Sequence, residues 1–419
     1  MAGSCPNTKD RTLTENGIKM PQGPNILGES GLPLSFEVVN TEQVGITPPE
    51  TRKGDSLRTW VRSLSVFQKE ALVASSRTGL VWRLSSDEGP YLDGHDEASC
   101  PLSFLTVGMI ASYMKEITAL ANQQDVTIHK LRLIQDNYYT MEGSMRKRTM
   151  VGGALPVELT VEIDCDLDDG PLNTFLLNAV SASPINGLMR GKLESLFALS
   201  KNGQKLELGK AKRISGSLYA DPGDQFDQCK FEASTLKEPL VEPQGVTPKK
   251  PVSGGTSAAG SSLADEQNRT LNIGGVCTLR EDGIKEITQL QYSPHGTSFK
   301  LLSEEAPING GQGRAPDANT YISAGVAFCF MTQFGRFVKM LNLDLEEYRV
   351  VQDSHFSLGG ASGNTGQAGK ADPFETHVYL KTSESDDVAR EMLDISEQTC
   401  FLHAFCRTDL KTKFCVNRI

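Results

Sequence analysis

Cysteine has the most reactive side chain in this sequence, and two of its nine cysteines stand where they could act together. Cys329 lies in the middle of the apolar stretch SAGVAFCFMTQFGRFVKML, and Cys400 lies in ISEQTCFLHAFC, about seventy residues later. A single thiol in such a stretch most often serves only as a small buried hydrophobe. Two thiols brought together by folding can instead form and break a disulfide during a redox reaction. The organisation of the chain around them favours the second interpretation.

The chain contains an internal repeat of two copies, at a constant offset of 217 residues. At this offset WRLSSDEGPYLDG, from Trp82, lies over FKLLSEEAPINGG, from Phe299, and LRLIQDNYYTMEG, from Leu131, lies over YRVVQDSHFSLGG, from Tyr348. Matches at Gly and Pro carry the most weight, because they indicate shared turn geometry rather than shared hydrophobicity. The sequence therefore predicts two copies of one fold.

The duplication provides an internal control for the two cysteines. At the same offset Cys329 falls on Ser112, and Cys400 falls on Ser183. Loss of both thiols from one copy is what an inactivated site would look like. We therefore predict that Cys329 and Cys400 form a working catalytic pair, and that Ser112 and Ser183 are its degenerate counterparts.

Each copy has the same predicted order of elements. Strand patterns come first, followed by a long apolar helix near residues 101–122 in the first copy and 319–342 in the second. Two more strands follow, and alternation of apolar residues through VELTVEID supports one of them. A second helix begins after acidic residues, which suit a helix N-terminus, and a final strand closes the unit. This order predicts an α+β fold with a mainly antiparallel sheet wrapped on a long buried helix.

The predicted domain boundaries follow from the repeat and from composition. Residues 1–55 are expected to form an irregular N-terminal arm, and residues 56–237 the first, degenerate domain. Residues 238–267 are rich in Pro, Gly, Ser and Ala, which predicts a flexible linker. Residues 268–419 then form the second domain, which retains the cysteine pair.

Composition limits the classes of partner. The net charge of −10, with a sequence pI of about 5.3, argues against nucleic acid or an anionic membrane surface. The longest apolar segments are interrupted by charged residues, and the first residues contain no apolar signal region. An odd number of scattered cysteines does not resemble a secreted disulfide framework. We therefore expect a cytoplasmic protein that acts on a small molecule, with further association into a homo-oligomer left open.

At the level of motifs, each half resembles the OsmC-like family, which includes organic hydroperoxide resistance proteins. The resemblance rests on Cys329 within AGVAFCFM, on Cys400 within SEQTCFLHA, and on the order of strands and helices. The first copy adds the Ser183-Pro184-Ile185 sequence, similar to a Ser-Pro-Val or Cys-Pro-Val run in the family. The resemblance implies intertwined α+β units with sites at their interface. A tandem chain of this kind is expected to fold as an intramolecular pseudo-dimer.

The resemblance also implies a reaction, which makes the protein an expected thiol peroxidase-like oxidoreductase of a stress response. The thiolate of Cys329 would attack a hydroperoxide and become a sulfenic acid, and Cys400 would condense with it to a disulfide. An external dithiol reductant would then restore both thiols, so that no bound cofactor is expected. The family also uses an Arg near the first strands and a Glu ten residues before the helix cysteine. Arg280 is the best candidate for the Arg, with Arg314 as second choice, and Asn319 stands where the Glu is expected.

The remaining site expectations concern binding and metals. The residues expected to contribute to substrate binding are Phe328, Phe330 and His403. Cys400, His403 and Cys406 form a C-x-x-H-x-x-C string, but helix geometry turns the third residue away from the first two, so we predict no metal site.

Two function classes remain open from the sequence. One is a hydroperoxide reductase with a single active site in the second copy. The other is a repurposed OsmC-like protein that uses Cys329 on another electrophile, in hydrolysis or sulfur chemistry, or only binds a small ligand. Asn319 favours the second class because an amide cannot carry charge. Retention of both cysteines favours the first.

Overall fold

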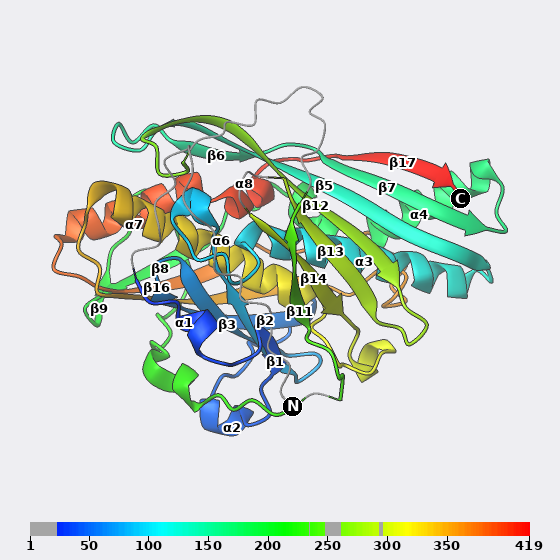
Figure 1. The fold of residues 1–419 in the computed structure, drawn as a ribbon, viewed down its shortest axis with the longest axis horizontal. Coiled ribbons are helices and arrows are strands. Elements are labelled where there is room, and N and C mark those ends of the chain that lie inside the picture. Colours follow the sequence, from blue (N-terminus) through cyan, green and yellow to red (C-terminus); the bar gives the residue numbers. More distant parts are fainter. Residues whose placement is uncertain (1–22, 234, 248–260, 293–295) are drawn as a thin grey trace, which may run out of the picture.

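The computed structural model describes residues 23–233, 235–247, 261–292 and 296–419. Two long helices, α3 (Pro101–Gln123) and α6 (Ala318–Leu341), lie side by side in the interior, and two large sheets cover them (Figure 1). The architecture is α+β, as the sequence predicts. Within the described residues, no helix is long and apolar enough to cross a membrane.

The two halves repeat one order of elements. The elements of the first half are α1 (Ile26–Glu29), β1 (Ser35–Glu37), α2 (Thr41–Val44), β2 (Gly54–Ser65), β3 (Gln68–Ser75), β4 (Val81–Ser86), the 3-10 turn η1 (Pro90–Leu92), α3, β5 (Ile128–Ser144), β6 (Val151–Ala154), β7 (Val157–Cys165), α4 (Asp169–Ala182), η2 (Pro184–Asn186), α5 (Gly187–Arg190), β8 (Leu196–Lys201), β9 (Gln204–Leu206), β10 (Lys212–Arg213) and η3 (Gly223–Gln228). Those of the second half are β11 (Val241–Val246), β12 (Glu266–Leu279), β13 (Lys285–Gln291), β14 (Thr297–Ser303), η4 (Pro307–Asn309), α6, β15 (Glu347–Ser357), β16 (Glu375–Lys381), α7 (Asp386–Thr399), α8 (Phe401–Arg407) and β17 (Thr412–Arg418). Helices α4 and α7 are offset by 217 residues at both ends, which matches the offset found in the sequence.

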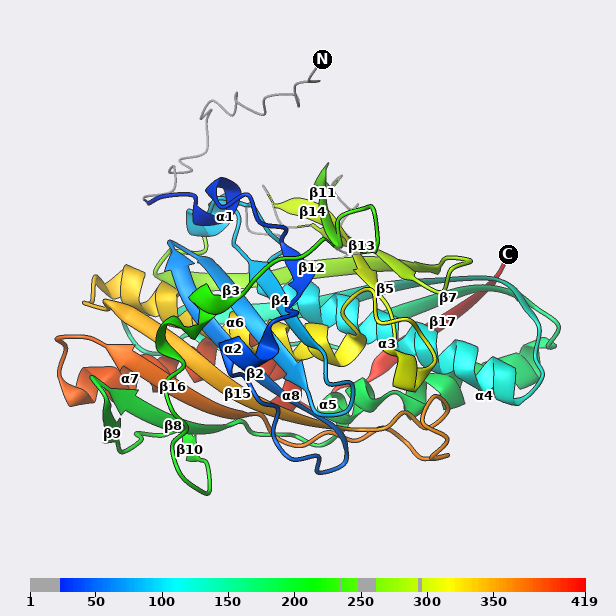
Figure 2. The same cartoon turned by 90° about the horizontal axis from the view of Figure 1, so that it is seen from below.

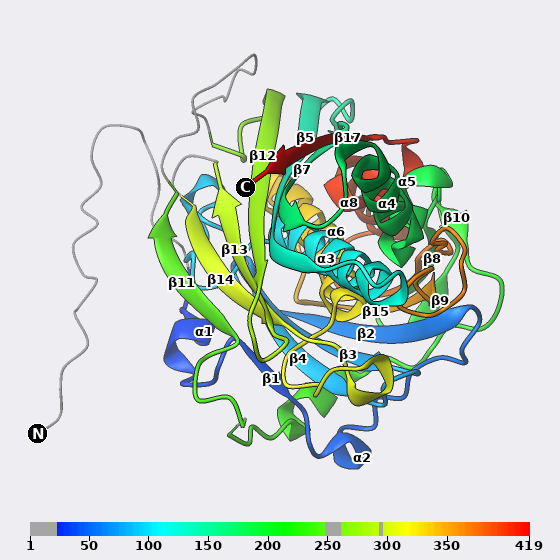
Figure 3. The same ribbon diagram turned by 90° about the vertical axis from the view of Figure 1, so that its right-hand side faces the viewer.

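Each sheet is built from both halves of the chain. In the first sheet the order is β1-β4-β3-β2-β15-β16-β8-β10, so that β15 and β16 of the second half lie between strands of the first. In the second sheet the order is β11-β14-β13-β12-β5-β7-β17, with the roles of the halves exchanged. Neighbours are mainly antiparallel, while the closing strands β8 and β17 pair in parallel with β16 and β7. Figures 2 and 3 show the resulting wrap of both sheets around the helices. The halves are therefore interlocked as a pseudo-dimer within one chain.

A matched pair of glycines sets the contact between the two long helices. A Cβ atom on Gly325 would come within 2.8 Å of the Phe104 Cβ, and one on Gly108 would collide with the side chain of Ile322. Because only glycine permits so close an approach, the first turns of each helix lie against the middle of the other. This crossing decides which residues face the cysteines.

The structure differs from the predicted boundaries in several places. The predicted linker contains β11 and the start of β12, while residues 248–260 lie outside the described part of the chain. The predicted irregular arm contains α1, β1 and α2, with residues 1–22 outside the described part. Strands β3 and β13 were absent from the sequence prediction. Because the sheets mix strands of both halves, neither predicted domain forms a sheet from its own strands alone.

Candidate functional site

Folding brings the two predicted cysteines into contact. The Sγ atoms of Cys329 and Cys400 lie 3.4 Å apart, and the two side chains are 2% and 0% exposed. Cys329 lies in the middle of α6. The sequence predicted Cys400 inside a helix, whereas the structure shows a break there: α7 ends at Thr399, Cys400 has an extended backbone, and α8 begins at Phe401. This break turns the Cys400 thiol toward α6.

The first half contains the same arrangement with oxygen in place of sulfur. The Oγ atoms of Ser112 and Ser183 lie 2.8 Å apart, and both side chains are buried. Ser183 also stands at a break, between α4 and the 3-10 turn η2. The structure thus pairs the serines as it pairs the cysteines.

The contact between the two thiols shifts their pKa values in opposite directions. Burial raises the pKa of Cys329 well above its ordinary value, and the neighbouring sulfur of Cys400 raises it further. Burial also opposes ionisation of Cys400, but the hydrogen bond between the two sulfurs and the adjacent His403 hold the pKa of Cys400 well below its ordinary value. The two thiols therefore titrate as a coupled pair, in which Cys400 is the more acidic group.

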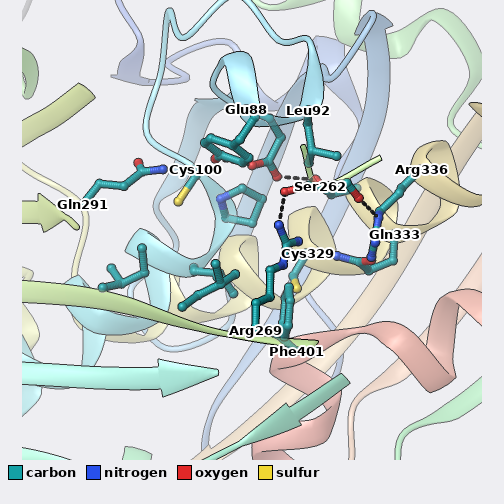
Figure 4. Close-up of a pocket in the computed structure, with 16 residues that line it drawn as sticks. Glu88, Leu92, Cys100, Ser262, Arg269, Gln291, Cys329, Gln333, Arg336 and Phe401 are labelled. Atoms are coloured by element: carbon teal, nitrogen blue, oxygen red, sulfur yellow. Dashed lines mark hydrogen bonds between the residues drawn. The ribbon is translucent and has the colours of Figure 1, made fainter. Parts of the chain in front are cut away.

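A cavity of about 50 Å³, with room for several water molecules, borders Cys329. Its walls come from both halves, since Cys100, Pro101 and Leu102 at the start of α3 line it together with Cys329 on α6. Figure 4 shows Cys100 and Cys329 among the residues around it. Cys400 does not line it. The Cys329 cavity therefore gives access to one sulfur of the pair. Burial raises the pKa of the third thiol, Cys100, to about 12, so that it stays protonated near neutral pH.

One carboxylate and two guanidinium groups also line the Cys329 cavity. Glu88 accepts hydrogen bonds from the Thr332 hydroxyl at 2.8 Å and from the Tyr91 hydroxyl at 2.6 Å. Arg269, on β12, donates to the Ser262 hydroxyl, and Arg336, on α6, donates from Nε to the Ser262 carbonyl at 2.8 Å. Figure 4 shows Ser262 between the two arginines.

The corresponding cavity of the first half borders Ser112 and measures about 30 Å³. Lys115 and Glu305, which line it, form an ion pair at 2.8 Å. Glu116 accepts from the backbone N–H groups of Ala361 and Ser362 at 2.9 and 3.1 Å. The Ser112 cavity is thus lined by polar side chains that are already bonded to protein groups.

Asn319 does not stand beside Cys329, contrary to the sequence prediction. It lines the Ser112 cavity, where its amide donates to the Asp55 carboxylate at 3.1 Å. Leu102, its counterpart in the first half, lines the Cys329 cavity instead. The reason is the helix crossing, which places the first turn of each long helix against the middle of the other.

The predicted arginines also lie elsewhere. Arg280 forms ion pairs with Glu238 at 2.5 Å and with Asp282 at 3.0 Å, near the turn between β12 and β13, and does not line the cavity. Arg314 pairs with Glu304 at 2.7 Å. Opposite charges at a strand end hold both guanidinium groups away from the thiols.

The three residues predicted to contribute to substrate binding are buried in the core and do not line the Cys329 cavity. Phe328 packs on Phe104, with ring centroids 5.2 Å apart. Phe330 and His403 pack on each other and on Phe197. On α6 these two phenylalanines flank Cys329 in sequence, so their side chains leave the helix in other directions. Within the described residues, no three His, Cys, Asp or Glu side chains gather as metal ligands would.

Sequence reasoning missed Glu88, Arg269 and Arg336, although two of them leave a signal. Arg336 follows Cys329 by seven residues, which is two helical turns and therefore the same face of α6. Glu88 matches Glu305 at the repeat offset, in SSDEGP over LSEEAP. Arg269 has no such signal, because pairing of β12 with β5 brings it to the cavity.

Comparison with known proteins finds similarity to one family. The family described as OsmC-like protein matches residues 311–414, which contain both cysteines. Among solved structures, the chain is similar to an OsmC-like hydroperoxide resistance protein from Jannaschia sp. CCS1 at 20% identity. That similarity covers 31% of this chain and 81% of the other, with a TM-score of 0.19. No curated protein matches the chain significantly. Residues 311–414 are thus similar to the OsmC-like family over about a quarter of the chain.

Proposed function

We propose that the protein is a thiol-dependent reductase of organic hydroperoxides, with one reactive site per chain. The observation that carries the proposal is the 3.4 Å contact between Cys329 and Cys400, beside a cavity that reaches Cys329. A disulfide requires an S–S distance of about 2.05 Å, so closing the bond needs an approach of only about 1.4 Å. Cys400 stands at a helix break, where its side chain can make such a shift.

The proposed reaction begins with a proton transfer between the two cysteines. Cys329 passes its proton to the Cys400 thiolate, and the Cys329 thiolate attacks the terminal oxygen of ROOH. An S–O bond forms, the O–O bond breaks, and the alkoxide leaves as ROH after taking the proton held by Cys400. The Cys400 thiolate then attacks the sulfenic sulfur, an S–S bond forms, and the departing hydroxide takes a proton from solvent. Two thiols and ROOH thereby give a disulfide, ROH and water.

Reduction of the disulfide requires an external dithiol. One thiolate of the reductant attacks the Cys329 sulfur through the cavity, and its second thiol releases the mixed disulfide, so that the reductant leaves oxidised. A cytoplasmic setting would supply such reductants, and the protein would serve in a response to peroxide stress. No bound cofactor enters this cycle.

The first half is proposed to be a degenerate OsmC-like copy. A serine hydroxyl cannot pass through the sulfenic and disulfide states, so the Ser112–Ser183 contact has no redox function. The matched geometry of the two pairs supports a common origin, with the chemistry kept only in the second half.

One observation favours a second candidate. An apolar side chain, Leu102, faces Cys329 where the family resemblance leads us to expect a charged group. In this second candidate function, Cys329 would act as nucleophile on another electrophile, such as a thioester or activated carbonyl, and Cys400 would serve only to accept its proton.

The experiment that separates the candidates uses reduced protein and one equivalent of cumene hydroperoxide. We expect consumption of the peroxide and a Cys329–Cys400 disulfide in the peptide map. Cys400→Ser should consume one equivalent, stop at a Cys329 sulfenic acid and lose turnover with dihydrolipoamide. Cys329→Ser should be inert, and Ser112→Ala is the matched control that should behave as the natural protein. Unconsumed peroxide with free thiols would rule out the peroxidase.

A further inference from the structure

We propose that the Cys329 cavity selects compact anionic hydroperoxides, whose carboxylate binds between Arg269 and Arg336. This rests on the proposed function and names its substrate class. A compact substrate here means one in which the carboxylate and the O–O bond are separated by only a few bonds.

The first evidence is unused hydrogen-bonding capacity in buried arginines. Arg336 is 1% exposed, and its Nη1 donates to Gln333 at 3.2 Å, but its Nη2 has no hydrogen-bond partner among the described residues. Arg269 is 7% exposed, and across the described ranges its Nε also lacks a partner. Buried donors are almost always paired in folded proteins, so two free donors in one cavity indicate a missing acceptor.

The second evidence is charge. Two cations line the cavity with one carboxylate, Glu88, and that group is already held by two hydroxyls. Burial and the charge of Arg269 lower the pKa of Arg336 to about 9, and burial lowers that of Arg269 to about 10, so both stay charged near neutral pH. An incoming carboxylate would give these buried guanidinium groups a direct partner, and a buried charge without one is costly.

The first half supplies an internal comparison. The position equivalent to Arg336 is Ala119, and the position equivalent to Arg269 is Arg52, which pairs with Glu375 at 2.5 Å. The Ser112 cavity therefore has no matching pair of free guanidinium groups among the described residues. The two arginines with unpaired donors therefore lie at the site that has the cysteines.

Geometry sets the size of the substrate. Arg336 begins about 10 Å along the axis from Cys329, but helical side chains lean toward the N-terminus, so its guanidinium reaches back toward the thiol. Both residues line a cavity of about 50 Å³. An anionic group bound by the arginines must therefore lie close to the reacting oxygen. A neutral alkyl hydroperoxide would leave the arginines unpaired, and a long chain ending in a distant carboxylate would not reach both groups at once.

The test compares tert-butyl hydroperoxide with the analogue in which one methyl group carries a carboxylate, and with the methyl ester of that analogue. We expect kcat/KM for the carboxylate to exceed that for its ester on the order of 100-fold, because a site built for a charged group rejects analogues without it. Arg336→Gln and Arg269→Gln should each reduce this ratio to below about tenfold. Arg280→Gln, an arginine outside the cavity, should leave the ratio unchanged. A ratio near one in the natural protein would overturn the anion site.

A binding measurement separates this proposal from the proposed reaction. Cys329→Ser protein is titrated calorimetrically with the alcohol product of the carboxylate peroxide, which cannot react. Binding that is lost in Cys329→Ser/Arg336→Gln supports the anion site even if no peroxide is reduced. Absence of binding in Cys329→Ser protein with a natural near-ultraviolet spectrum refutes it. If Arg336→Gln fails to fold, Arg336→Lys, which keeps the charge but loses the planar fork, should weaken binding and reduce the ratio.

Discussion

Oxidation by one equivalent of hydroperoxide should stabilise the fold measurably. The Cys329–Cys400 disulfide would close a loop across a sequence separation of 71 residues. In the chain-entropy description, a loop of this length lowers the entropy of the unfolded state enough to contribute about 4 kcal/mol at 25 °C. The sulfurs start 3.4 Å apart and Cys400 stands at a helix break, so that little strain should subtract from this value.

The assay is urea unfolding of the reduced and the peroxide-treated protein, followed by circular dichroism. The oxidised protein should unfold at a higher urea concentration, with a free energy of unfolding larger by up to about 4 kcal/mol. Dithiothreitol should reverse the gain. Cys400→Ser isolates the effect, because its Cys329 can be oxidised but cannot close the loop, so its unfolding curve should not shift with peroxide.

Two results would refute this reasoning. The first is a mapped Cys329–Cys400 disulfide in a protein that unfolds at a lower urea concentration than the reduced form. It would mean that the disulfide is strained although the reduced sulfurs lie 3.4 Å apart. An equal gain in the Cys400→Ser variant would place the stabilisation outside the disulfide loop.

Three further predictions concern the frame of the molecule. The Ser112→Cys/Ser183→Cys variant should form a second disulfide under mild oxidation, since its parent oxygens lie 2.8 Å apart; free thiols in the peptide map would contradict the matched geometry. Burial lowers the pKa of His377 to about 4, and its Nδ1 accepts from the Tyr219 N–H. The unfolded chain therefore binds a proton that the fold excludes, and stability should fall by up to about 3 kcal/mol between pH 6.5 and 4, an effect that His377→Gln should remove from urea unfolding curves. Halves separated at residue 237 should be insoluble or unfolded alone and should assemble when coexpressed; two stable monomers in analytical ultracentrifugation would contradict the interlocked sheets.

The duplication and the cysteine pair could be predicted from the sequence for a physical reason. A repeat at a fixed offset preserves turn residues and strand periodicity, and those features are local. Once two copies are aligned, Cys329 and Cys400 stand out by their common replacement with serine. Alternation of apolar residues then predicts β7 directly. Strand β3 is buried at every position, and the buried side of β13 includes the polar Lys285, Gln289 and Gln291, so neither strand shows apolar alternation.

The walls of the site could not be predicted in the same way, because they depend on which segments cross. The family resemblance assigns Asn319 to the site of Cys329, because Asn319 stands ten residues before the cysteine, where the family keeps a Glu. The glycine contact between α3 and α6 instead places the first turn of each helix against its partner. Leu102 therefore lines the cavity at Cys329, and Asn319 lines the cavity at Ser112. Arg269 reaches the cavity through strand pairing between halves, a contact that no local pattern encodes.

This exchange also explains why a half without cysteines at its own site can remain necessary. The first half supplies Glu88, Cys100 and Leu102 to the cavity at Cys329, and its strands complete both sheets. Its own cavity has no thiols to accommodate, so Lys115 and Glu305 can occupy that space as an ion pair. The first half is thus free to lose its own chemistry but not its contacts. Substitutions on the first turn of α3 should therefore change reactivity at Cys329, whereas equivalent substitutions on α6 should change only stability.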